Sequence, residues 1–581
     1  SPSSDFMVAG ISEAGEGRLS SGLLSSLRTV PKGFSYKTLL VWESGVNSAW
    51  ETWGHFLTDL YGKKRPSNEA DVGLRYLGYW TDNGATYYYN YDTTKGYEGT
   101  LLAEKRHLDS INIPVRYLQL DSWWYLKGFV PPDGHAPDRN ESKTSSLPAG
   151  EWNRYGGLLE YVPAPELFPR GLKAFRDSLG IPLITHNRWI ERDSPYRQTY
   201  RISGIGAVDR RWWEKIISQI KAWGVVTYEQ DWLSMIYRYS PEFSTTTWAG
   251  HQFLEEMSAA CARHGMTMQY CMALPRHFLA GGAQYSNLTS IRVSGDRFER
   301  EKWKEFLYGS RMASALGVWP WADVFMSTER NNLLLATLSG GMVGIGDAYG
   351  SEDPANVAFA VRPDGVIVKP DVPIVPTDPT VLADAKGIPA CRTAYTFSRD
   401  PGSHGAEKTV YLFSYNDSKI TAPVVTRPAD VGLQGKVFVY DFSTETGRVM
   451  AATDSMPDIP AGGSSYSILA AVGPSTMALI GDPGKFVSRG RQRIDWVQNL
   501  PTGIEASVIF GEKESSVTLV GFAPSRPGVA TGRGSARLLR YDTHSGQFTI
   551  ELTMGRESRT TEHHGDATAK MDVRIALRSG G

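Results

Sequence analysis

The chain has 581 residues, more than one hydrophobic core usually serves, so we expect two or three domains. Hydrophobic residues make up 41% and charged residues 21%, a balance typical of folded rather than disordered chains. The formal net charge of −1 excludes a basic surplus, and no run of about 20 apolar residues is present. We therefore expect neither a nucleic acid nor a membrane as the main partner.

Aromatic residues are abundant, with 17 Trp, 28 Tyr and 21 Phe. Such rings fill cores and also stack on the apolar faces of sugars. We expect most of them in cores, but the run Trp123-Trp124-Tyr125 to be exposed. The three cysteines form neither a disulfide framework nor a zinc pattern, and no His/Cys cluster indicates a catalytic metal. No cofactor is expected.

In chain order, residues 37–42 predict a strand and residues 49–61 an amphipathic helix. From about residue 73, short apolar runs alternate with helical stretches, of which 210–223 has the clearest apolar face. Eight strands alternating with helices over roughly 280 residues predict a (β/α)8 TIM barrel. A doubly wound sheet is the alternative, but no glycine-rich phosphate loop follows the first strand. The predicted strands are 73–80, 115–123, 182–190, 225–231, 267–271, 290–293, 317–321 and 341–345, and the other predicted helices are 99–111, 171–179, 250–264 and 300–316.

The remaining segments complete the expected domain organisation. Residues 124–168 are too long for a plain connection and predict an insertion above the carboxyl end of strand two. Residues 362–390 are rich in Pro and predict a linker after a barrel that spans 71–361. Short alternating strands over 391–581 predict a C-terminal β-sandwich.

Five predicted strand ends finish in an aspartate, and catalytic groups of TIM barrels sit at such ends. Any one of these residues could instead cap a following helix, but five caps in a row are a weaker explanation. A retaining glycosidase needs two neighbouring carboxyl groups, one ionised and one protonated, and strands four and six could supply them. The five residues are Asp121, Asp231, Asp296, Asp323 and Asp347.

The same segments resemble glycoside hydrolase family 36 of clan D, especially its raffinose-synthase and alkaline α-galactosidase branch. The motifs keep the family's order over about residues 73–380, and they are Leu118-Gln-Leu-Asp121-Ser-Trp123, Gly224-Val-Val-Thr-Tyr-Glu-Gln-Asp231, Arg292-Val-Ser-Gly-Asp296, Trp321-Ala-Asp323-Val-Phe and Arg362-Pro-Asp-Gly.

The resemblance implies an α-galactosidase-like enzyme acting on an oligosaccharide or glycoside, with Asp231 as nucleophile and Asp296 as acid/base. It also implies that Asp121 and Arg292 bind the sugar. A transglycosylase of the raffinose-synthase type would use the same residues, and an α-glucosidase is a further alternative. The other candidate substrate-binding residues are Trp80, Asp82, Trp123, His186, Arg188, Glu229, Asp323 and Asp347.

Three positions depart from the family motifs. Glu229 stands where the family has a sugar-binding lysine, Ser122 replaces the second aspartate of the strand-two motif, and Gly295 replaces an aspartate in the strand-six motif. A cation donates hydrogen bonds whereas a carboxylate accepts them, so we expect a different sugar or orientation. The same departures keep open a catalytically degenerate barrel that serves as a carbohydrate-binding or structural subunit.

The family also carries an N-terminal β-sandwich, of which residues 1–70 could hold only the tail and a linker helix. The predicted strand 37–42 would then leave an edge exposed. We expect it to pack against a separate N-terminal chain or a detached fragment of the same precursor.

Overall fold

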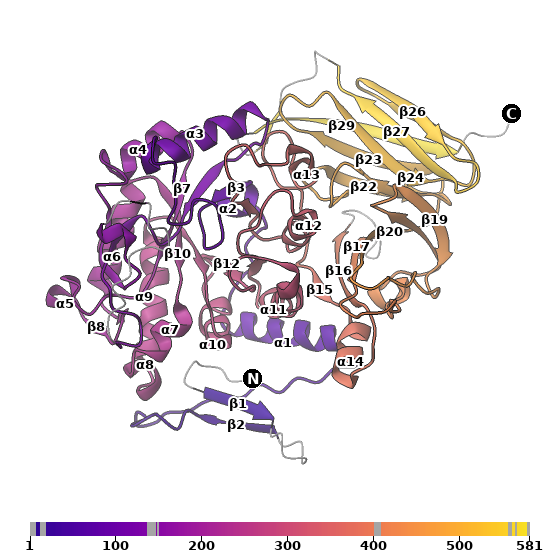
Figure 1. The fold of residues 1–581 in the computed structure, drawn as a ribbon. Coiled ribbons are helices and arrows are strands. Elements are labelled where there is room, and N and C mark those ends of the chain that lie inside the picture. Colours follow the sequence, from indigo (N-terminus) through magenta and orange to yellow (C-terminus); the bar gives the residue numbers. More distant parts are fainter. Residues whose placement is uncertain are drawn as a thin grey trace.

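The computed structural model describes residues 7–11, 19–135, 147, 150–399, 408–555, 561–563 and 566–577 (Figure 1). Its centre is a sheet of eight parallel strands that neighbour one another in chain order. The last strand pairs with the first, and a parallel bridge between Phe325 and Ile345 closes the ring between strands seven and eight. The expected (β/α)8 barrel is therefore confirmed. Its strands are β3 (Gly78–Trp80), β4 (Tyr117–Leu120), β7 (Leu183–Asn187), β10 (Val225–Gln230), β11 (Thr267–Tyr270), β12 (Leu288–Arg292), β13 (Trp319–Trp321) and β14 (Gly344–Ile345).

Helices surround this ring close to the predicted positions. In α6 (Arg210–Ala222) the buried residues recur with helical spacing, and the Asp209 side chain accepts from the Arg211 N–H to cap the helix. The other long helices are α3 (Gly96–Ser110), α4 (Gly171–Leu179), α9 (Ala249–Arg263), α11 (Trp303–Ala315) and α12 (Arg330–Leu338); the shorter ones are α2 (Val72–Arg75), α5 (Tyr196–Thr199), α7 (Leu233–Arg238), α8 (Glu242–Thr245), α10 (Pro275–His277) and α13 (Pro354–Ala358). None of the helices in these described ranges is long and apolar enough to cross a membrane.

Large side chains from several strands pack together inside the barrel. Trp80 and Trp321 meet edge to face with ring centroids 5.5 Å apart, and the Trp80 indole donates to the Tyr117 hydroxyl at 2.9 Å. A Cβ at Gly344 would lie 2.0 Å from the Trp80 ring, so only glycine leaves room for this indole. Trp80 is fully buried and forms part of the barrel floor.

The N-terminal segment differs from the prediction. Residues 37–42 form no strand; Thr38 makes an isolated bridge, and Leu40 and Trp42 are 76% and 92% exposed. The apolar run has no strand beside it to pair with, which is why β-propensity alone misleads here. The predicted helix is present as α1 (Val46–Leu60), whose first N–H groups donate to the Asp378 carboxylate at 2.9 and 3.0 Å. A hairpin of β1 (Met7–Ile11) and β2 (Leu19–Leu23) precedes it.

Two small antiparallel pairs extend from the barrel. Part of the predicted insertion folds as β5 (Tyr125–Lys127) and β6 (Leu158–Pro163), with a short helix η1 (Glu151–Asn153) between them. Residues 136–146 and 148–149 of this insertion lie outside the described residues. The second pair is β8 (Ile202–Ser203) and β9 (Gly206–Ala207), and single turns η2 (Phe278–Gly282) and η3 (Arg300–Lys302) flank later strands.

Antiparallel sheets form the C-terminal region. A six-stranded sheet comes first, and a four-stranded and a five-stranded sheet then share one apolar core, which confirms the β-sandwich. The Pro-rich stretch 362–390 supplies the first strand and α14 (Asp378–Lys386). The six-stranded sheet contains β15 (Val375–Pro376), β16 (Arg392–Arg399), β17 (Lys408–Tyr415), β18 (Lys436–Asp441), β19 (Thr446–Ala451) and β20 (Ser464–Ala471), with the short helix η4 (Pro428–Val431) in a connection. The four-stranded sheet contains β21 (Ala478–Gly481), β24 (Ser516–Phe522), β26 (Ser535–Tyr541) and β27 (Gln547–Thr553). The five-stranded sheet contains β22 (Ile494–Leu500), β23 (Gly503–Phe510), β25 (Pro527–Thr531), β28 (Thr561–His563) and β29 (Asp566–Leu577).

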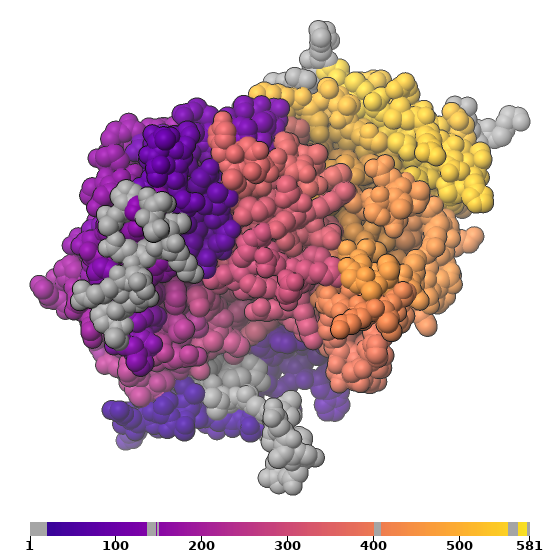
Figure 2. All heavy atoms as spheres, viewed as in Figure 1, coloured from indigo at the N-terminus to yellow at the C-terminus, as the bar shows by residue number. Residues whose placement is uncertain are grey.

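Barrel and sheets present one continuous surface in the view of Figure 2. Backbone hydrogen bonds join them, including Phe486 N–H to the Phe359 carbonyl at 2.8 Å and Ile374 N–H to the Leu338 carbonyl at 3.0 Å. The Arg362 guanidinium adds a bond to the Gln492 carbonyl at 2.6 Å. The C-terminal sheets therefore pack directly on the second half of the barrel.

A buried pair of carboxyl groups joins helix α3 to the segment that follows strand eight. Burial and then the neighbouring Glu352 raise the pKa of Glu104 to about 10, so Glu104 is protonated at neutral pH. Glu352 in turn lies 3.2 Å from His107 Nε2. Glu104 therefore holds a proton that folding must retain.

We expect Glu104→Gln to stabilise the protein at pH 8 by roughly 2 kcal/mol or more, because Gln needs no proton to be buried. The folded-state pKa lies above the ordinary value of 4.5, so the parent loses stability as pH rises from about 4.5 towards 10. Urea unfolding across this range measures the difference, which should vanish near pH 4.5. The exposed Glu301→Gln is the control, and a pH-independent gain in Glu104→Gln would contradict the buried, protonated Glu104.

Candidate active site

Asp231 follows β10 and lies at the carboxyl end of the barrel. Its carboxylate accepts from His186 Nε2 at 3.0 Å and from the Trp232 N–H at 2.6 Å. His186 is itself fixed, because the Tyr125 hydroxyl lies 3.0 Å from its Nδ1. Burial alone would raise the pKa of Asp231, but the His186 hydrogen bond and the charges of His186 and Arg292 lower it below its ordinary value. Asp231 is therefore an ionised carboxylate held in one orientation.

Arg292, the last residue of β12, joins two other predicted site residues. Its guanidinium forms ion pairs with Asp323 and, at 2.8 Å, with Asp296. The Asp296 carboxylate also accepts from Asn83 Nδ2 at 2.9 Å, and its side chain is 48% exposed. Asp323 is almost fully buried instead. Burial raises its pKa to about 7, although the Arg292 charge lowers it. The outer carboxyl, Asp296, thus faces solvent while the inner one, Asp323, anchors the arginine.

The floor beneath these groups is a chain of polar side chains. Gln269 donates to Gln119 at 3.1 Å, and Gln119 donates to Asp82 at 2.9 Å. Within the described residues, no donor reaches the buried oxygens Asp82 Oδ2, Glu229 Oε2 and Gln269 Oε1. Buried acceptors without donors are costly, so this layer is suited to receive donors from a ligand.

Glu229 lies in this layer beside Gln269 in the register of β10 and β11. Burial and then the carboxyl groups of Asp82, Asp121 and Asp231 raise its pKa well above the ordinary value. Among the ion pairs of the described side chains, none joins Glu229 to Arg188 or Arg292. These causes favour the protonated form of Glu229, which can both donate and accept a hydrogen bond.

Three predicted site residues make contacts that hold parts of the fold together: Trp123, Arg188 and Asp347. Trp123 is fully buried and stacks on Tyr97 with centroids 3.6 Å apart, and the whole Trp123-Trp124-Tyr125 run is buried, so its predicted exposure is wrong. Its apolar surface fills space under the insertion instead. Arg188 donates to the carbonyls of Tyr155 and Gly156 at 3.2 and 3.1 Å. Asp347 accepts from the N–H and hydroxyl of Ser327, which ties the segments after strands seven and eight together.

The backbone is strained at three positions in the segments that follow strands β10, β11 and β12. Trp232, Met272 and Arg297 have positive φ angles of 59°, 47° and 53°, and each is the residue after Asp231, Cys271 or Asp296. A non-glycine residue in this region costs on the order of 1–3 kcal/mol and persists where surrounding contacts fix it. The strain turns the chain sharply away while the preceding side chain remains at the barrel mouth.

Sequence reasoning missed several residues that shape the site. Tyr125 holds His186, and a hydrogen bond from the Cys271 thiol helps to lower the pKa of Asp231. Gln119 and Gln269 were also missed, although period-two alternation on their strands would place them on the same face as Asp121 and Cys271. No group of three or more His, Cys, Asp or Glu side chains in the described ranges could hold a metal ion.

Comparison with known proteins found no matching family model and no matching curated sequence. Solved structures do resemble the chain. They include a glycoside hydrolase family 27 β-L-arabinopyranosidase from Geobacillus stearothermophilus (12% identity, 71% of this chain and 98% of that one, TM-score 0.47). Another is α-galactosidase I from Mortierella vinacea (12% identity, 69% and 98%, TM-score 0.44). A third is the α-galactosidase from Thermus thermophilus in complex with stachyose (15% identity, 53% and 67%, TM-score 0.33). The strand order, rather than these likenesses, establishes the barrel.

Removal of the Arg292 charge should destabilise the protein, because it leaves the buried Asp323 without its partner. We expect Arg292→Met to cost roughly 3–5 kcal/mol at pH 8 and less at pH 5, where Asp323 is protonated. Chemical unfolding at both pH values measures this loss. The exposed pair of Arg537 and Glu551, 3.1 Å apart, offers the control: Arg537→Met should cost less than about 1 kcal/mol. Equal small losses in both variants would contradict a paired, buried Arg292.

Proposed function

We propose that this protein is a retaining α-glycosidase of the α-galactosidase type, which releases a terminal α-linked sugar from an oligosaccharide or glycoside. One observation carries the proposal: an ionised, hydrogen-bonded Asp231 and a half-exposed Asp296 lie at the ends of barrel strands four and six, with the Arg292 charge acting on both. The order of the family-like motifs along the sequence agrees with this assignment.

In the first step of the proposed reaction, a carboxylate oxygen of Asp231 attacks the anomeric carbon. The glycosidic C–O bond breaks, and Asp296 gives its proton to the leaving oxygen, so a covalent glycosyl-enzyme forms. In the second step Asp296 takes a proton from water, the water oxygen attacks the anomeric carbon, and Asp231 leaves as a carboxylate. Two displacements retain the configuration. They require the two carboxyl groups to be about 5–6 Å apart.

The environments of the two residues support these different roles. Asp231 is kept ionised by His186 and Arg292, which suits a nucleophile. Asp296 is the most exposed of the predicted carboxyl groups, so it can exchange protons with solvent and reach a leaving group. Asp323 is an unsuitable acid, because it is 1% exposed and its carboxylate is bound to Arg292.

Sugar recognition in this proposal falls to the polar floor. Asp82, Glu229 and Gln269 carry the unsatisfied oxygens described above, and sugar hydroxyls supply the missing donors. A lysine at position 229 could only donate, whereas the neutral Glu229 can also accept. The floor therefore favours a sugar with a hydroxyl group placed to donate a hydrogen bond to Glu229. A lysine at this position would favour a sugar with a hydroxyl group placed to accept one.

Substitution of the two aspartates should separate their roles. With aryl α-glycosides as substrates, we expect Asp231→Gly to lower kcat by roughly 10³-fold or more for every leaving group, and azide to restore turnover with a product of inverted configuration. Asp296→Ala should lose about 10²–10⁴-fold with poor leaving groups but little with dinitrophenolate, which needs no proton. The kcat values with each leaving group test the two expected losses of rate. NMR of the product tests the expected inversion in the azide reaction of Asp231→Gly.

Inversion by the parent enzyme would contradict the double displacement. If the parent turns over no aryl α-glycoside but still binds a sugar, the degenerate barrel becomes the better interpretation. A larger rate with sugar acceptors than with water would instead identify a transglycosylase.

Glu229 should set the preference among sugars. We expect Glu229→Lys to raise the ratio of kcat/KM for an α-galactoside to that for an α-glucoside, because it restores a donor at the floor. Glu229→Gln is the matched control, since it keeps the shape and the neutral charge and should move the ratio less. An unchanged ratio in an active Glu229→Lys enzyme would show that this residue does not determine specificity.

A further inference from the structure

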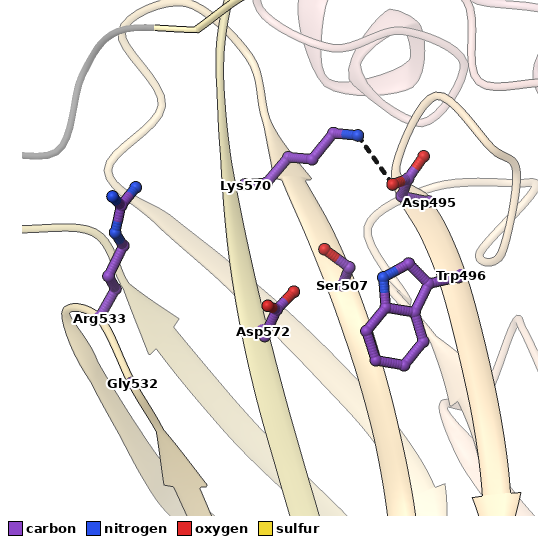
Figure 3. A pocket seen from close by; sticks show the side chains of 7 residues that line it. All are labelled: Asp495, Trp496, Ser507, Gly532, Arg533, Lys570 and Asp572. Atoms are coloured by element: carbon purple, nitrogen blue, oxygen red, sulfur yellow. Dashed lines mark hydrogen bonds and ion pairs between the residues drawn. The ribbon is translucent and has the colours of Figure 1, made fainter.

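A cavity of about 540 Å³ opens on the five-stranded sheet of the C-terminal sandwich, whose strands β22, β23 and β29 are at the upper right of Figure 1. Its volume lies within the range of roughly 300–1,000 Å³ typical of small-ligand sites. Figure 3 shows charged and aromatic side chains projecting into the same space from three strands and a neighbouring loop. The side chains that line it are Asp495, Trp496, Ser507, Arg533, Lys570 and Asp572.

The strand register explains why these side chains share one face, with a register irregularity between Ile494 and Trp496 that lets Asp495 line the same cavity as Trp496. Trp496 pairs with Ser507, and Ser507 pairs with Asp572, which gives a row across β22, β23 and β29. The next residues on these strands, Val497 and Val573 among them, are buried in the sandwich core. Because successive side chains on a strand alternate between faces, the row points away from that core. The cavity is thus built into the sheet.

The charges of the cavity balance one another. Lys570 binds Asp495 at 2.7 Å, and Arg533 and Asp572 add one charge of each sign. A site for a phosphate or a nucleic acid would show a positive surplus, which this cavity does not have. Instead it offers donors from Lys570 and Arg533 and acceptors from the two aspartates, the mixture that neutral hydroxyl groups require.

Trp496 adds the second element of sugar recognition. It is half-buried, and Figure 3 shows its indole beside Ser507, with its face presented to the viewer. An aromatic face packs against the apolar C–H face of a sugar ring while polar neighbours bind the hydroxyls. Tryptophan also provides the largest such surface among the side chains at low conformational cost.

We propose that this cavity is a second carbohydrate-binding site, in which Trp496 stacks on one sugar ring of a neutral oligosaccharide or polysaccharide and Asp572, Lys570 and Arg533 bind its hydroxyls. The site is non-catalytic and goes beyond the activity proposed for the barrel. It retains a long glycan on the protein while the barrel mouth acts on a chain end.

Native gel electrophoresis in the presence of galactomannan, and separately of soluble starch, tests the site. The full chain carries Asp231→Asn so that the polysaccharide stays intact. We expect at least one polysaccharide to slow migration, and Trp496→Ala to weaken this binding at least tenfold. Trp496→Phe should retain part of it, and Asp572→Ala should also weaken it. Trp42→Ala, which removes an exposed tryptophan elsewhere, should have no effect.

A second readout separates this site from the barrel. In the otherwise native chain, Trp496→Ala should leave kcat/KM for a small aryl α-glycoside within about twofold, because such a substrate does not span both sites. If the parent turns over no aryl glycoside, the proposed enzyme function fails, yet Trp496-dependent retention still supports the second site. Retention of Trp496→Ala equal to that of the parent, or no retention of the parent by either polysaccharide, would overturn this proposal.

Discussion

The buried charge of Arg292 constrains the rest of the site. A guanidinium removed from water needs acceptors for its N–H groups, and here Asp323 and Asp296 provide them as carboxylates from the segments after strands seven and six. Asn83, after strand one, completes the link by donating to Asp296. One side chain therefore connects three strand ends and fixes where the exposed carboxyl group lies relative to Asp231.

Most of the barrel was predictable because its periodicity is local. Apolar runs of strand length alternate with helical stretches such as 210–223, and this rhythm leaves few architectures. Acids at strand ends were predictable for the same reason. The strand at 37–42 was predicted wrongly because a strand exists only with a partner, and no sequence pattern states which segment lies beside it.

The supporting contacts of the site were harder to predict, since they depend on three-dimensional neighbours. The sequence does not show that Tyr125, from the insertion, meets His186 on strand three. Nor does it show that Trp123, next to a site residue, turns into the core. Ionisation states are equally non-local: Glu229 is neutral because burial and three carboxyl groups act together, and these come from different strands.

The closure of the barrel has a consequence for how this architecture can be inherited or engineered. Strand eight contains only two residues, and a single bridge at Phe325 joins it to the strand-seven segment. The C-terminal sheets bind the neighbouring segments through Phe359 and Leu338. These contacts flank the strand with the shortest pairing in the ring. A truncated version that keeps the barrel alone would lose the contacts on both sides of that strand.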